Sequence, residues 1–230
     1  MIRRDYLLRM VTELTQVLLR IVSLRYRREH ERALQELDQA LQRLGDAPPL
    51  TSGSAQAELA VWISLCQNQD QEVTAGLMLA VARLWRERAE LQALRHEPEA
   101  TGRCRVLALG LLLEAVLAQG AMVSGELLDD IEQLYHQTGE VERPVKLLQQ
   151  LLLYFEARGQ FARGEDVLFE WLEMEDLGAR AAAVAAGHSF YERLLALPDA
   201  DLENGNLPRA EVEAGLNELR RAHASNGAAS

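Results

Sequence analysis

The feature that most limits the possible folds is residues 141–174, where two helical patterns are separated by one very short linker. Apolar residues in the first pattern recur at intervals of three and four, which places them on one helical face: Val145, Leu148, Leu152 and Phe155. The pattern stops at Gly159, a residue that suits the left-handed end of a helix, and restarts at Phe161. Such a short linker predicts two adjacent antiparallel helices.

Similar helical patterns fill the rest of the chain, and alternating strand-like runs are hard to find. We therefore expect one all-α domain over residues 1–224, followed by a disordered tail at 225–230, which has no apolar anchor. Residues 103–118 are apolar nearly all round and predict a central helix. Residues 199–205 predict a turn region, and the charged residues of the helix near 71–96 predict a solvated face: Arg83, Arg86, Glu87, Arg88 and Glu90.

The two helices of residues 141–174 resemble a tetratricopeptide unit. Gly159 and Phe161 match the turn glycine and the following aromatic of that family, and Gly164 stands where the family prefers alanine. Later positions depart from the family's pattern, since Asp176 replaces the closing proline. The resemblance implies antiparallel helical hairpins stacked in a degenerate tetratricopeptide-like superhelix or bundle, rather than a standard peptide-binding array.

Three short segments resemble a family of uncharacterised bacterial all-helical proteins. They are DYLLRM at residues 5–10, GHSFYERLL at 187–195 and NGNLPRAEV at 204–212. This resemblance implies a tetratricopeptide-like fold and implies no activity.

Composition limits the compartment and the class of partner. The net charge of −11 disfavours nucleic acid as the main partner. Cys66 and Cys104 are far apart and lie in apolar helical patterns, so we expect two buried free thiols, which suit a reducing, cytoplasmic location. No signal peptide is visible, and the longest apolar run is far shorter than the roughly 20 residues of a membrane span.

Motifs of known catalytic chemistry are absent from the sequence: it holds no P-loop, dinucleotide-binding, GxSxG, HExxH or CxxC pattern. We therefore expect a protein that is not an enzyme and needs no cofactor. The best candidates for metal ligands are Asp129, Glu132 and His136, whose spacing places them on one helical face. A solvated helix face explains the same residues, and a metal-dependent helical-bundle enzyme is the least favoured hypothesis.

The function that we favour is a scaffold or interaction protein that presents a helical groove or face to another protein or to a second copy of itself. Residues 1–28 hold seven arginines against two acidic residues, a net charge of +5, so the remainder carries −16. The alternative is a peripheral membrane or self-assembling protein that uses the basic helix 2–28. That helix also fits a core helix whose arginines face water or pair with the acidic remainder.

Candidate partner-binding residues are the arginines Arg3, Arg4 and Arg9 of this helix, together with Arg209. Arg209 lies in the first turn of the last helix, where the helix dipole disfavours a positive charge. We expect it to pair with Glu192 or with a partner's carboxylate. The alternative is a buried ion pair within the chain that docks the last helix.

Overall fold

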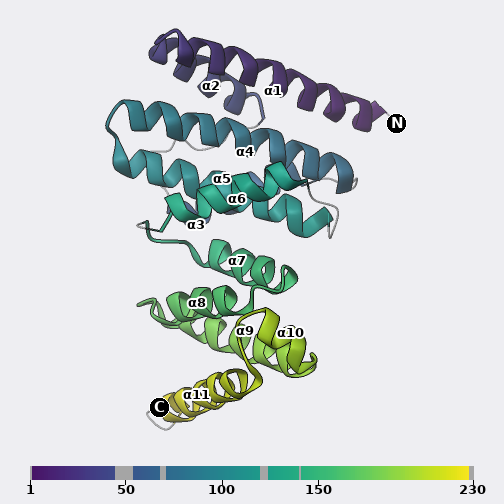
Figure 1. The fold of residues 1–230 in the computed structure, drawn as a ribbon. Helices are drawn as coiled ribbons and strands as arrows, with labels where there is room; N and C mark the ends of the chain where they lie inside the picture. Colours follow the sequence, from purple (N-terminus) through teal and green to yellow (C-terminus); the bar gives the residue numbers. More distant parts are fainter. Residues whose placement is uncertain (1, 45–53, 68–70, 120–123, 140, 228–230) are drawn as a thin grey trace. The chain divides into compact units, whose positions relative to one another are not determined.

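The computed structural model is all-helical, which confirms the predicted fold class. It describes residues 2–44, 54–67, 71–119, 124–139 and 141–227, with the backbone alone at 2–8, 71 and 222–227. Within these ranges eleven helices follow one another without a strand (Figure 1). Their bounds are α1 Ile2–Tyr26, α2 His30–Gln42, α3 Ala55–Cys66, α4 Gln71–Leu94, α5 Pro98–Gln119, α6 Gly125–Gln137, α7 Val145–Ala157, α8 Phe161–Leu172, α9 Leu177–Leu195, α10 Asp199–Asn204 and α11 Arg209–Gly227.

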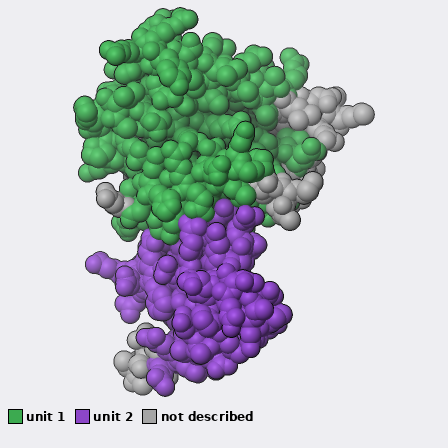
Figure 2. Space-filling view, in the orientation of Figure 1, with its two compact units in different colours: residues 1–147 green, residues 148–230 purple. Residues whose placement is uncertain are grey.

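The chain divides into two compact units, residues 1–147 and residues 148–230 (Figure 2). The sequence predicts one domain over residues 1–224. The division into two compact units does not test that prediction. Helix α11 continues to Gly227, so the helical backbone includes part of the expected tail. The last three residues of that tail lie outside the described residues.

One expected turn region is a helix instead. Residues 199–204 form α10, with Pro198 at its N-cap position. Asp199 and Asp201 lie in its first turn, where the helix dipole favours negative charge. Leu202 is fully buried and anchors this short helix. With only six residues, α10 is too short to show the helical periodicity that identifies longer helices.

The helices of the first unit pack on one another in succession (Figure 1). Helices α1 and α2 pack on α4, α4 packs on α5, and α5 packs on α3 and α6. Helix α5 is buried on nearly every side, as predicted for residues 103–118. Cys66 and Cys104 are buried free thiols, as expected, and burial raises the pKa of each to about 12.

The second unit begins inside α7 and holds most of the hairpin on which the sequence argument rests. Helices α7 and α8 are joined at Gly159, whose φ of +67° lies in the left-handed region that glycine tolerates best. Helix α9 packs on α8, and α11 packs on α9. The core between these helices is aromatic, since Phe155, Trp171, Phe190 and Tyr191 are all fully buried.

The turn between α10 and α11 closes over the start of α8. The carbonyl oxygen of Gly205 accepts a hydrogen bond from the backbone N–H of Ala162, at 3.1 Å. That N–H belongs to the first turn of α8, where backbone donors have no partner within the helix. A Cβ atom on Gly205 would lie 2.2 Å from the Phe161 ring and 2.8 Å from the carbonyl oxygen of Gly159. This position therefore has room for glycine alone.

We expect Gly205→Ala to lower the free energy of unfolding by about 2–3 kcal/mol, because backbone and an aromatic ring must move to admit the methyl group. The control is Gly76→Ala in α4, where no atom lies within 4 Å of the added Cβ. That control should stabilise by about 0.5–1 kcal/mol. Urea unfolding followed by circular dichroism measures both, and equal effects would refute the steric argument.

A carboxylate and a phenol pair inside the second unit. The hydroxyl of Tyr191 donates to Glu165 Oε1 at 2.7 Å. Burial raises the pKa of the Glu165 carboxyl; the Tyr191 hydrogen bond opposes this effect, and nearby Glu211, Asp166 and Glu218 add to it. A carboxyl whose pKa is raised by folding takes up its proton more readily in the folded state. Its ionised form therefore lowers stability at neutral pH.

Glu165→Gln should raise the free energy of unfolding at pH 7, because the amide still accepts from Tyr191 and carries no charge. The gain should shrink as the pH falls toward the unfolded-state pKa of about 4.5, since the wild-type carboxyl is then protonated too. Urea unfolding at several pH values tests this, with exposed Glu213→Gln as the control. If the stability gained by Glu165→Gln instead grew as the pH fell, the prediction would be wrong.

Candidate functional site

Three consecutive residues of α4 form ion pairs with three different helices. Arg86 pairs with Asp130 of α6, Glu87 with Arg25 of α1, and Arg88 with Asp38 of α2. Successive helical residues point about 100° apart, so the three side chains leave α4 in different directions. The solvated face predicted for this part of α4 is therefore wrong at these positions.

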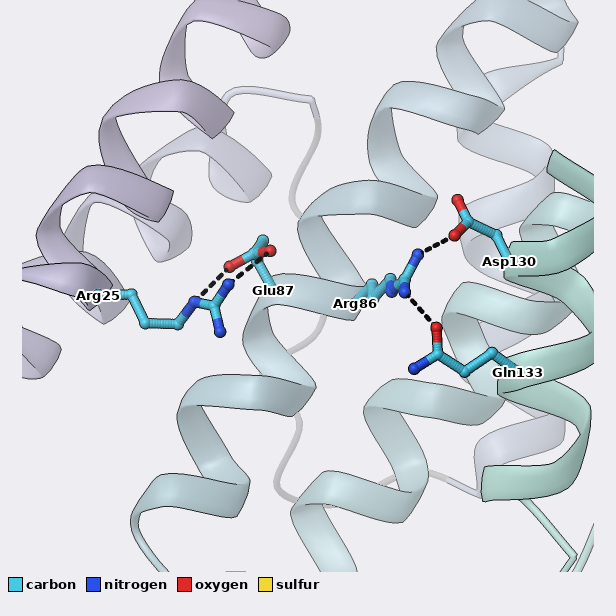
Figure 3. Close-up of polar contacts among 5 residues, drawn as sticks. All are labelled: Arg25, Arg86, Glu87, Asp130 and Gln133. Atoms are coloured by element: carbon cyan, nitrogen blue, oxygen red, sulfur yellow. Dashed lines mark hydrogen bonds and ion pairs between the residues drawn. The ribbon is translucent and has the colours of Figure 1, made fainter. Parts of the chain in front are cut away.

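Two of these pairs border a polar cleft between α1, α4 and α6 (Figure 3). Arg25 Nε lies 3.0 Å from Glu87 Oε2, and Arg86 also donates to Gln133 Oε1 at 2.6 Å. The Arg25 and Glu87 side chains are only 23% and 15% exposed. The cleft has a volume of about 380 Å³, and its lining residues are Leu18, Arg25, Arg83, Arg86, Glu87, Glu90, Asp130 and Gln133.

The cleft balances its own charge, because its lining holds three arginines and three carboxylates. Burial raises the pKa of the Glu87 carboxyl, and the neighbouring guanidinium of Arg25 opposes that rise. The lining offers no hydroxyl, thiol or imidazole that could act as a nucleophile. Its evident role is to hold α1 and α6 against α4 through directional, charge-assisted hydrogen bonds.

A second hollow, here named the α1–α2 groove, lies nearer the start of α1 than the cleft does. It has a volume of about 350 Å³ and is lined by Arg9, Met10, Glu13, Leu14, Val17, Ala40, Arg43 and Leu44. Its floor is apolar, since Leu14, Val17 and Ala40 are buried. Arg9 and Arg43 are exposed, and neither guanidinium has a hydrogen bond or ion pair to another described residue.

From Leu14 onward, α1 behaves as a core helix. Its apolar stripe is buried: Leu14, Val17, Ile21 and Leu24. Two of its arginines pair with acidic residues of other helices, Arg20 with Glu36 and Arg25 with Glu87. Arg3 and Arg4 belong to α1, but their side chains lie outside the described residues. Of the three arginines predicted to bind a partner through this helix, Arg9 is thus the one whose side chain the structure describes.

Arg209 is used inside the second unit. It donates to the carbonyl oxygens of Leu195 and Leu197, at 3.0 Å and 2.6 Å, and forms an ion pair with Asp199. Leu195 is the last residue of α9 and Leu197 lies two residues beyond it, a place where backbone acceptors lack partners and positive charge is favoured. Arg209 therefore pairs within the chain, as the alternative predicted, but with Asp199 in place of Glu192. The pair is not buried, because the Asp199 side chain is 70% exposed.

The three candidate metal ligands do not form a site. Throughout the part of the chain that the structure describes, no three His, Cys, Asp or Glu side chains are placed to hold a metal ion. His136 Nε2 lies 4.0 Å from Glu132 Oε2, and Asp129 is exposed. These residues match the solvated helix face that was the other explanation.

The sequence argument missed Arg43 and the cleft. Arg43 directly follows α2 and forms a groove only because α1 lies alongside it. The residues of the cleft come from helices far apart in the sequence, so no local pattern brings them together. Their one sequence signal is the alternation of charge at positions 86–88, which is typical of any solvated helix.

We expect Glu87→Ala to lower the free energy of unfolding by about 2 kcal/mol, since it leaves the largely buried Arg25 guanidinium without its counter-charge. Glu36→Ala removes a carboxylate from the more exposed pair with Arg20 and should cost about 0.5 kcal/mol. Urea unfolding compares the two variants. Equal costs would mean that the cleft pair contributes no more than a surface pair.

No helix in the described ranges has an apolar stretch long enough to cross a membrane. The family described as "Family of unknown function (DUF6483)" matches residues 1–224. No curated protein and no solved structure matches the chain. The family match covers nearly the whole chain and agrees with the expected resemblance to an uncharacterised, all-helical family. The chain therefore belongs to this family of unknown function, DUF6483.

Proposed function

We propose that the protein is a non-enzymatic interaction protein of the bacterial cytoplasm that binds a partner protein in the α1–α2 groove. The observation that carries this proposal is the combination of an apolar floor with two exposed arginines that have no partner among the described residues. Arginine beside a buried apolar patch is typical of the residues that dominate binding energy at protein interfaces.

The groove suits a partner better than the polar cleft does. A ligand in the cleft would compete with ion pairs that already satisfy Arg25 and Arg86. Breaking such a pair leaves a partly buried charge uncompensated, which costs free energy. Arg9 and Arg43 need to break no ion pair with a described residue before they meet a partner. Binding at the groove therefore sacrifices no ion pair with a described residue.

The membrane alternative has less support. The apolar stripe of α1 that would enter a lipid surface is buried within the first unit. Among the α1 residues whose side chains the structure describes, the exposed large apolar ones are Leu19 and Tyr26, at 66% and 78%. They are separated by two helical turns, and the exposed positions between them include Arg20 and Ser23. A membrane-binding helix needs a much larger apolar face.

We further infer that the hairpins stack as they do in tetratricopeptide proteins. Support comes from the α7–α8 hairpin, where the turn glycine and the following aromatic occupy the roles that the resemblance implies. Gly164 supports it too, because the Phe190 ring and Leu152 lie 3.3 Å and 3.6 Å from the place where a Cβ would be. A small residue is thus suited to this point between helices.

Photocross-linking in the native host tests the proposed function. The photoreactive residue p-benzoylphenylalanine replaces Leu44, which lines the groove, or Ala181, an exposed residue of α9 that serves as the control. We expect one protein adduct from position 44 and none from position 181. The adduct should disappear when Arg9→Glu and Arg43→Glu are added to the chain.

Both arginines are exposed, so their replacement should leave the fold intact, and circular dichroism verifies this. The absence of a position-44 adduct, or an adduct that survives both substitutions, would refute binding at the groove.

A further inference from the structure

We propose that the occupant of the α1–α2 groove is an acidic amphipathic helix of another protein. This inference rests on the proposed function and names the chemical class of its partner. The apolar face of the helix would cover the groove floor, and its Asp or Glu residues would pair with Arg9 and Arg43.

The shape of the groove favours side chains carried on a helix. Its volume of about 350 Å³ is near the lower end of the range of roughly 300–1,000 Å³ that is common for binding pockets. It therefore takes a few side chains and not the broad face of a domain. Leu14, Val17 and Ala40 are buried at its floor, so the partner needs apolar residues that project into the groove. A flat lipid surface cannot reach that floor.

The charge of the groove favours carboxylates. Arg9 and Arg43 outnumber Glu13, the one acidic residue of the lining, and the groove therefore carries a net charge of +1. Other arginines of α1 already have their carboxylates, Glu36 for Arg20 and Glu87 for Arg25. The two groove arginines have no such partner among the described residues, and an incoming acidic helix would supply it.

The same charge argues against a second copy of this chain bound through its own α1. Residues 1–28 carry a net charge of +5, so two such segments repel each other. A helix with the opposite sign is attracted over a distance of about 10 Å at moderate ionic strength. Binding should consequently weaken as salt is added.

Two synthetic peptides test the inference on the full chain. Each is about 16 residues long, enough for a helix in water, with leucines at positions i, i+3, i+4 and i+7. One carries Glu beside the leucines and the other carries Lys at the same positions. We expect fluorescence anisotropy to show binding of the Glu peptide, weakened about tenfold by Arg9→Glu or by Arg43→Glu. The control Arg27→Glu changes an exposed arginine that directly follows α1 and lies outside the groove, and it should alter affinity less than twofold.

Several outcomes would overturn the inference. The first is equal affinity for the two peptides, including no binding of either. The second is a loss of affinity with Arg27→Glu as large as that with Arg9→Glu or Arg43→Glu. Binding to phosphatidylglycerol vesicles that depends on Arg9 and Arg43 would assign the groove to a membrane. A dimer mass by light scattering that both substitutions abolish would assign it to a second copy.

Failure of the inference and failure of the proposed function can be told apart by the position-44 adduct. If the adduct forms and mass spectrometry maps it to a segment without acidic residues, the groove binds a protein but the inference is wrong. If no adduct forms, the proposed function fails as well. An adduct within an acidic helical segment supports both.

Discussion

The first unit depends on the ion pairs that spread from three consecutive residues of α4. Arg86, Glu87 and Arg88 tie this helix to α6, α1 and α2. Apolar side chains accept many packing arrangements of similar free energy, whereas charge-assisted hydrogen bonds are directional. A rotation of α4 about its own axis would break at least one of the three pairs. Apolar burial thus supplies most of the stability, and the polar triplet selects one rotation of the helix.

The same pairing determines where positive charge is left at the surface. Acidic residues of α2 and α4 neutralise Arg20 and Arg25 in the second half of α1. Nearer its start, Arg9 forms no ion pair with a described residue although Glu13 lines the same groove, and Arg43, just after α2, increases the local charge. Part of the positive excess of residues 1–28 therefore lies at one groove. The proposed interaction site is a consequence of how the core helices satisfy one another.

The longer helices could be predicted from the sequence because their apolar residues repeat with helical spacing. The sequence also predicted the turn at Gly159 and the burial of both thiols. It failed where the outcome depends on elements that meet only in space. Arg209 was correctly recognised as locally unfavourable, but its partner is Asp199 because α10 brings that residue close. A six-residue helix leaves no periodic signal, so this geometry could not be foreseen.

The hydrogen bond from Ala162 to the Gly205 carbonyl has a consequence for the order in which the second unit forms during synthesis. The α7–α8 hairpin leaves the ribosome well before the turn that covers the start of α8. Until residues 204–206 emerge, that N–H and the Phe161 ring lack the neighbours that they have in the finished fold. The start of α8 therefore lacks these contacts during the first part of synthesis. It gains them only when the turn at residues 204–206 has been made.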